Sequence, residues 1–170
     1  MSYKPFEWKD LGDISTGRTN LGPEMPVAVY RLFEFTTKDV LTRRYGAETA
    51  KEIIRECGFI AGSEFYKNVI QEDNLTFDNF ISKLQKAILQ YKIGVLRIES
   101  ADIARKRITL TVAEDIDCSG LDVADEAVCN YDEGFIAGIL KCYTGCDWDV
   151  LEIDCWATGD RVCRFKAIGR

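Results

Sequence analysis

The chain has 170 residues, of which 46% are hydrophobic and 29% charged, and its formal net charge is −6. This length and composition are typical of one soluble domain with a real hydrophobic core. The acidic balance argues against nucleic acid or an anionic membrane surface as the main partner. No segment is apolar enough to insert into a membrane, and residues 1–8 lack the apolar stretch of a signal peptide, so we expect a cytoplasmic protein.

The N-terminal half has the pattern of three helices. Residues 1–25 show no clear period and are expected to form an irregular arm, with a short strand as the alternative. Apolar residues then recur at helical spacing from Pro26 to Gly46, a candidate C-cap. A second helix is predicted over about 47–70. A third is predicted to follow a capping residue near Asn74 or Thr76.

The C-terminal half changes to a period of two. Residues 96–98 and 108–112 alternate between apolar and polar side chains, which predicts two antiparallel strands joined by a short turn. Residues 116–127 have the composition of an acidic loop. A fourth helix is predicted over about 129–143, closed by Gly145, and two more strands near 148–155 and 162–168. The order ααα-ββ-α-ββ predicts an α+β fold, with helices packed on an antiparallel sheet of about four strands.

One pentapeptide, Gly-Phe-Ile-Ala-Gly, occurs twice, at 58–62 and at 134–138. Both copies fall inside predicted helices, where each glycine costs up to ~1 kcal/mol relative to alanine. Small residues four apart lie on one helix face and let another backbone come close. We therefore predict that the second and fourth helices pack tightly through these glycines. A chance echo is the alternative.

Cysteine and glutamate residues near the C-terminus offer a metal site. The chain contains seven cysteines and no histidine, so a transition metal must be held by thiolates and carboxylates. Cys129, Glu152, Cys155 and Cys163 form a complete tetrahedral set for a closed, structural Zn²⁺ site. Glu152 and Cys155 can share a metal only if the strand bulges between them. Plain burial of the cysteines in the core is the alternative.

A rival set uses Cys142 and Cys146 at the end of the fourth helix. Together with Cys155 and Cys163 they would make a four-thiolate zinc or iron–sulfur site. The remaining cysteines, Cys57 and Cys118, are interpreted as a core and a loop residue respectively.

The best-matching stretches, 128–134, 152–155, 159–160 and 163–165, resemble the 4-vinyl reductase domain family. The resemblance covers most of residues 26–168. In the family's phenol-sensing transcription activators, zinc is held with the spacing C-x22-E-x2-C-x7-C, which corresponds here to Cys129, Glu152, Cys155 and Cys163. The family also implies a fold like subunits of the TRAPP tethering complex, a homodimer, and binding of hydrophobic small molecules or hydrocarbons.

The chain also departs from the phenol sensors. Those proteins hold the ligand hydroxyl with a histidine, and they carry an ATPase domain and a helix-turn-helix that this sequence lacks. Phenol is therefore not carried over as the ligand. We expect residues 26–170 to form a free-standing ligand-binding domain with a C-terminal zinc site.

Three functions from different classes remain open. The first is a binding module for a hydrophobic or lipid-like small molecule. The second is a vinyl-group reductase, although no G-x-G-x-x-G dinucleotide motif is present. For that reading Tyr131, Asp132 and Glu133 are candidate proton donors, with solvated positions at a helix start as the simpler interpretation. The third is a TRAPP-like assembly or scaffold subunit.

Five phenylalanines on the helical stripes are candidates for a pocket lining, and core packing is the simpler interpretation of each. They are Phe33, Phe59, Phe65, Phe80 and Phe135.

Overall fold

A computed structural model of the chain describes residues 3–124 and 126–170. The chain divides into two compact units, the first ending at Ala50 and the second running from Lys51 to Arg170. None of the described helices is both long enough and apolar enough to cross a membrane.

The first unit contains helical segments. Residues 3–25 form two short turns, η1 (Trp8–Leu11) and α1 (Ile14–Gly17), with no strand between them. The long helix α2 (Val27–Tyr45) begins after Pro26 and ends at Gly46, as predicted. Gly46 has a φ of +87°, a conformation that glycine adopts without strain.

The helices of the second unit follow the sequence pattern closely. Helix α3 (Ala47–Phe65) starts in the first unit and runs on into a π-helical turn, η2 (Tyr66–Ile70), so the predicted span of 47–70 is confirmed. Helix α4 (Phe77–Gln90) is capped by Thr76, whose Oγ1 accepts the Asn79 N–H at 3.4 Å. Helix α5 (Asn130–Thr144) ends at Gly145, which adopts the left-handed conformation.

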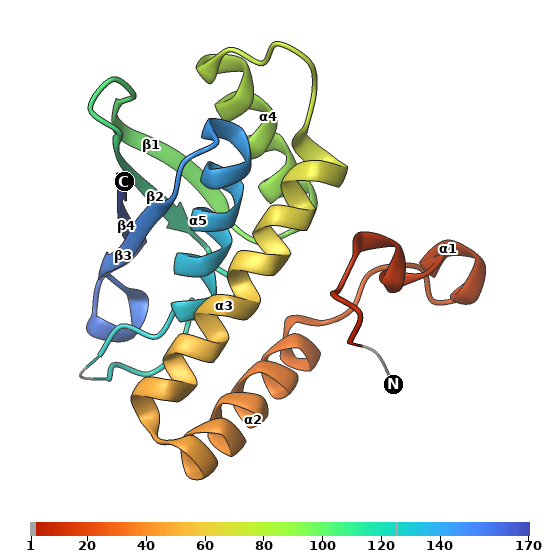
Figure 1. The fold of residues 1–170 in the computed structure, drawn as a ribbon. Helices are drawn as coiled ribbons and strands as arrows, with labels where there is room; N and C mark the ends of the chain where they lie inside the picture. Colours follow the sequence, from red (N-terminus) through yellow and green to blue (C-terminus); the bar gives the residue numbers. More distant parts are fainter. Residues whose placement is uncertain (1–2, 125) are drawn as a thin grey trace. The chain divides into compact units, whose positions relative to one another are not determined.

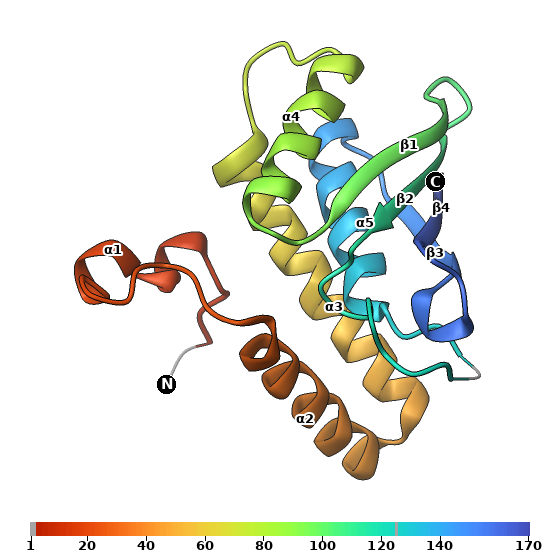
Figure 2. The ribbon, with the colours of Figure 1, turned by 180° about the vertical axis from the view of Figure 1, so that it is seen from behind.

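Four antiparallel strands form one sheet in the order β1-β2-β4-β3. The strands are β1 (Val95–Asp102), β2 (Arg107–Ala113), β3 (Trp148–Asp154) and β4 (Cys163–Gly169). Helices α4 and α5 cover one face of this sheet, and α3 lies along the outer side of α5 (Figures 1 and 2). The predicted α+β class, strand number and element order are confirmed.

The two central strands bury alternate residues toward the helices. In the register of β2 and β4, Leu110 lies opposite Phe165 and Val112 lies opposite Cys163. All four side chains are buried. Cys163 is therefore part of a continuous apolar face, which fixes its sulfur on the helix side of the sheet.

The four glycines of the repeated pentapeptide bring α3 and α5 into backbone contact. A β-carbon at Gly58 would overlap the Tyr131 carbonyl, and one at Gly62 would overlap the Phe135 carbonyl. The contact is reciprocal, because a β-carbon at Gly134 would overlap the Arg55 carbonyl and one at Gly138 the Phe59 carbonyl. The predicted packing of these two helices through their glycines is confirmed.

The glycine contact predicts a large effect of one methyl group. Gly62→Ala forces α3 and α5 apart, so we expect it to lower the free energy of unfolding by about 1–3 kcal/mol. Gly17→Ala is the control, because Gly17 has no atom within 4 Å of an added β-carbon and an ordinary φ. Urea denaturation measures both. Equal stability of the two variants would contradict the close backbone packing.

Candidate functional site

The first turn of α5 is buried, although helix starts are usually solvated. Cys129 is the N-cap residue of α5 and is completely buried. Asp132 and Glu133 follow with only 6% and 3% of their surface exposed. The interpretation of Asp132 and Glu133 as solvated residues is wrong, because the loops before α5 and after β2 pack over this end of the helix (Figure 1).

Four cysteine sulfurs meet beside this turn. The Sγ atoms of Cys118, Cys129, Cys155 and Cys163 all lie within 4.8 Å of one another, and all four residues are buried. The Sγ of Cys129 lies 3.8 Å from that of Cys155 and 3.7 Å from that of Cys163. The structure thus brings together the three cysteines expected from the sequence.

Cys118 is the member that sequence reasoning missed. Its Sγ lies 3.0 Å from that of Cys163. The residue is in the acidic loop after β2, as expected, but the loop is folded inward and held by backbone bonds from Ile116 N–H to Ile93 and from Ser119 N–H to Asp115. A cysteine within an acidic loop gives no periodic signal, so spacing alone did not reveal it.

Glu152 also reaches the cluster, because β3 is irregular at that point. The pairing of β3 with β4 shifts register between Glu152 and Asp154, so Glu152 and Cys155 are both buried on the same side. The strand irregularity that the sequence required is confirmed. Glu152 Oε2 accepts the Cys129 N–H at 3.1 Å, whereas Oε1 has no hydrogen-bond partner among the described residues.

The acidic groups of the site perturb one another. Burial raises the pKa of the Glu152 carboxyl to about 8, and the negative charge of Cys155 adds to the rise. Hydrogen bonds from the neighbouring thiols, that of Cys118 first, lower the pKa of Cys155, so Cys155 is the first of the cluster to ionise. Burial also raises the pKa of Asp132 well above its usual range, and the nearby Asp115 carboxylate adds to this effect.

The sulfur spacing fits a tetrahedral metal centre. A zinc ion with sulfur ligands at about 2.3 Å holds those sulfurs roughly 3.8 Å apart, and the two Cys129 pairs match this value at 3.8 and 3.7 Å. The Cys118–Cys163 pair is shorter, so this edge would have to lengthen if both were ligands. The donor set is thiolate-rich, which suits zinc and other soft metals.

The rival pair is not part of this cluster. Cys142 Sγ lies 3.8 Å from the Ser63 carbonyl oxygen, and Cys146 Sγ lies 3.3 Å from Thr144 Oγ1. Neither joins the four-sulfur group found among the described residues. Cys57 is exposed, so its interpretation as a core residue is wrong.

Glu133 ties the turn to two other elements. Its Oε2 accepts two bonds from the Arg55 guanidinium on α3, at 2.9 and 2.6 Å. Its Oε1 accepts the Glu152 N–H on β3 at 2.9 Å. Because the carboxylate is buried and bonded through both oxygens, it positions α5 and β3 together and holds Cys129 close to Glu152.

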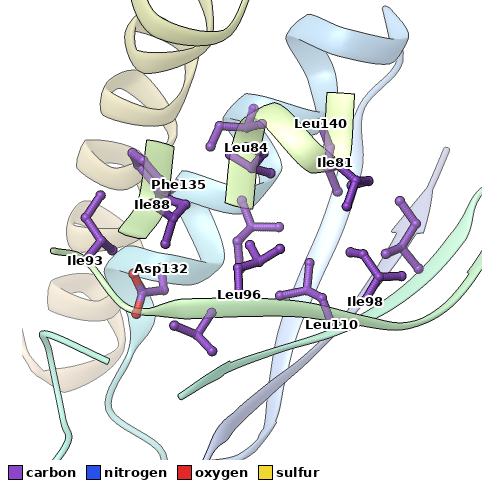
Figure 3. Close-up of a pocket in the computed structure, with 14 residues that line it drawn as sticks. Ile81, Leu84, Ile88, Ile93, Leu96, Ile98, Leu110, Asp132, Phe135 and Leu140 are labelled. Atoms are coloured by element: carbon purple, nitrogen blue, oxygen red, sulfur yellow. The ribbon is translucent and has the colours of Figure 1, made fainter. Parts of the chain in front are cut away.

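An apolar pocket lies next to the same turn, between α4, α5 and the sheet (Figure 3). Its interior is narrow, with about 30 Å³ open to the centre of a water-sized sphere. Of the five candidate phenylalanines, Phe135 lines it. The other lining residues are Ile81, Leu84, Ile88, Ile93, Leu96, Ile98, Ile108, Leu110, Val112, Asp132, Ile136, Ile139 and Leu140.

Comparison with known families identifies the C-terminal part of the chain. Residues 108–168 match the 4-vinyl reductase domain. The resemblance to this family is thereby confirmed for the segment that contains β2, α5, β3 and β4. Cys118, Cys129, Cys155 and Cys163 all fall within the matched segment.

Two uncharacterized proteins of Methanocaldococcus jannaschii are similar to the chain over most of its length. One is 28% identical over 152 residues, which cover 86% of this chain and 79% of the relative. The other is 26% identical over 160 residues, which cover 92% and 85% respectively.

Solved structures share the fold at low sequence identity. The phenol-responsive sensory domain of the transcription activator PoxR, bound to phenol, superposes with a TM-score of 0.69 at 15% identity, over 85% of this chain and 75% of that one. A vinyl-4-reductase family protein from Methanocaldococcus jannaschii gives 0.66 at 16%, over 100% and 99%. A trafficking protein particle complex subunit 3 from Naegleria fowleri, covalently bound to palmitic acid, gives 0.65 at 10%, over 85% and 94%.

The Glu133 contacts predict a stability difference between two ion pairs that both link α3 to the region of α5. Glu133→Gln removes the charge from a buried carboxylate that accepts bonds from Arg55 and from Glu152 N–H, so we expect a loss of about 1.5–3 kcal/mol. Glu126→Gln is the control, since Glu126 is 62% exposed where it pairs with Lys51, and we expect at most about 1 kcal/mol. Thermal and urea unfolding report both. A Glu133→Gln variant as stable as the control would rule out the positioning role.

Proposed function

We propose that this protein is a small-molecule binding domain that takes a hydrophobic ligand between its helices and its sheet, stabilised by a structural zinc ion. The observation that carries the ligand part is the pocket: all its lining side chains except Asp132 are apolar, and they come from three different layers of secondary structure. The match to the 4-vinyl reductase domain and the fold shared with a phenol-responsive sensory domain support the same function.

The size of the pocket sets a condition on the ligand. An open space of about 30 Å³ has room for about two waters, so a larger molecule requires lining side chains to move apart. Ile81, Leu84 and Ile88 come from α4, which packs on the edge strand β1 (Figure 3). We therefore expect the ligand to be slender and α4 to shift when it binds.

Zinc is proposed on the donors Cys129, Glu152, Cys155 and Cys163. The unpartnered Oε1 of Glu152, buried next to three thiols, supports Glu152 as the fourth ligand. Cys118 is the competing fourth ligand, because its sulfur lies inside the same group. With four ligands from the chain, such a centre would brace the hairpin of β3 and β4 against α5 rather than activate water.

A homodimer in a reducing, cytoplasmic setting completes the proposal. The seven cysteines are all free, which suits such a compartment. Helix α2 has no buried residue, and Leu32 and Phe33 are 65% and 73% exposed. A second copy of the chain would give this apolar surface a partner.

The metal proposal predicts which substitutions remove zinc. Cys155→Ser and Cys163→Ser should each abolish zinc binding and lower the melting temperature, whereas the Cys142→Ser control should keep one zinc per chain. Native mass spectrometry against the denatured mass measures zinc, and shows in the same spectrum whether two chains associate. Because zinc replaces thiol protons, its affinity should rise with pH. Retention of zinc in all three variants would contradict the site.

The identity of the fourth ligand is open to a separate comparison. If Glu152 is the ligand, Glu152→Gln loses zinc and Cys118→Ser keeps it. In cobalt-substituted protein the sulfur-to-cobalt absorbance then corresponds to three thiolates and does not change in Cys118→Ser. The opposite pattern would assign the position to Cys118.

The ligand proposal predicts that filling the pocket blocks binding. We take 1-fluorohexane as a slender apolar probe that ¹⁹F NMR detects. Ile98→Trp should weaken its binding by about tenfold or more, because the larger ring overfills the pocket. Ile103→Trp is the matched control, in the turn between β1 and β2 where Ile103 is exposed. Equal binding by both variants would exclude this pocket as the site.

A further inference from the structure

The pocket between α4, α5 and the sheet contains one polar side chain, that of Asp132. In Figure 3 the Asp132 carboxyl lies at the Ile93 end of the pocket, close to the ribbon of β1, and every other labelled side chain there is hydrocarbon. Asp132 is in the first turn of α5, so the close contact of α5 with α3 holds it in place. A fixed polar group in a dry apolar pocket is the arrangement by which binding sites select ligand orientation.

The protein satisfies the Asp132 carboxyl only in part. Its side chain is 6% exposed and shares a hydrogen bond with the Asp115 carboxyl, but its Oδ2 atom has no hydrogen-bond partner among the described residues. By contrast, the neighbouring Glu133 carboxylate uses both oxygens in bonds to Arg55 and to the Glu152 N–H. Buried polar atoms without partners are uncommon in native proteins and call for a specific reason. A ligand group that bonds to Oδ2 would provide that partner.

The chemistry of the pocket narrows the choice of that group. An ammonium group has three donors, and the hydrocarbon side chains around Asp132 would leave two of them without acceptors. A carboxylate would add a second negative charge beside Asp132 and its neighbour Asp115. A hydroxyl both donates and accepts one bond, so it suits the Asp132 carboxyl whether or not that carboxyl carries a proton.

We propose that Asp132 is the head-group site of the pocket and that the ligand is a slender hydrocarbon with one terminal hydroxyl. This inference rests on the proposed function, because it takes the same pocket as the binding site. Asp132 then determines specificity: the apolar residues hold the hydrocarbon body, and the Asp132 Oδ2 bonds to the hydroxyl. Asp132 is not a member of the four-sulfur group, so that group and the head-group site use different side chains.

The test compares 1-hexanol with 1-fluorohexane, which has nearly the same shape but no hydroxyl. Binding of 1-fluorohexane is followed by ¹⁹F NMR, and 1-hexanol is added as a competitor. In the wild-type protein we expect 1-hexanol to bind at least about tenfold more tightly, a factor that corresponds to about 1.4 kcal/mol. Asp132→Leu should lose this preference and still bind 1-fluorohexane, whereas Asp132→Asn, which keeps an acceptor oxygen, should retain it.

Each other outcome overturns the inference in a recognisable way. If the wild type binds both probes equally, or if Asp132→Leu keeps the preference for 1-hexanol, the pocket still binds ligands but Asp132 is not the head-group site. If Asp132→Leu loses zinc while Asp132→Asn keeps it, Asp132 serves a metal instead, together with Asp115 and Cys129, whose ligand atoms lie within 4.8 Å of its own. If the wild type binds neither probe, the proposed ligand-binding function fails together with the inference.

Discussion

Direct backbone contact between α3 and α5 is the constraint on which the site depends. At Gly58, Gly62, Gly134 and Gly138 a single β-carbon would overlap a carbonyl group of the opposite helix. Helices that approach this closely have little freedom to slide or rotate relative to each other. The start of α5 is therefore held at a fixed height and angle against the sheet, and that turn carries the side chains of the site.

Successive residues of this turn serve different neighbours because each helical residue points about 100° away from the previous one. Cys129 faces the sulfur cluster, Asp132 faces the apolar pocket, and Glu133 faces Arg55 and β3. A shift of α5 would disturb all three environments together. Under the proposed function, a ligand that moves elements around the pocket would thus be felt at the cysteine cluster through one rigid turn.

The interior next to α5 holds an unusual amount of acidic chemistry. Asp115, Asp132 and Glu152 are buried beside four thiols, and Arg55, which approaches the same turn from α3, bonds to Glu133 instead. Burial raises the pKa of each of these three carboxyls, and neighbouring negative charges add to the rise. A divalent cation among the sulfurs would offset this repulsion, which is an electrostatic argument for the proposed metal that does not depend on ligand spacing.

Periodicity in the sequence determined the elements of this fold, because a core-facing stripe depends only on local spacing. It also indicated the glycine contact and the need for a bulge after Glu152. What the pattern left undetermined was decided by packing between distant segments. Cys118 joined the sulfur cluster because its loop folds inward, and Asp132 became buried because other loops cover the start of α5. Such burial arises from non-local contacts, which residue spacing along a single chain does not encode.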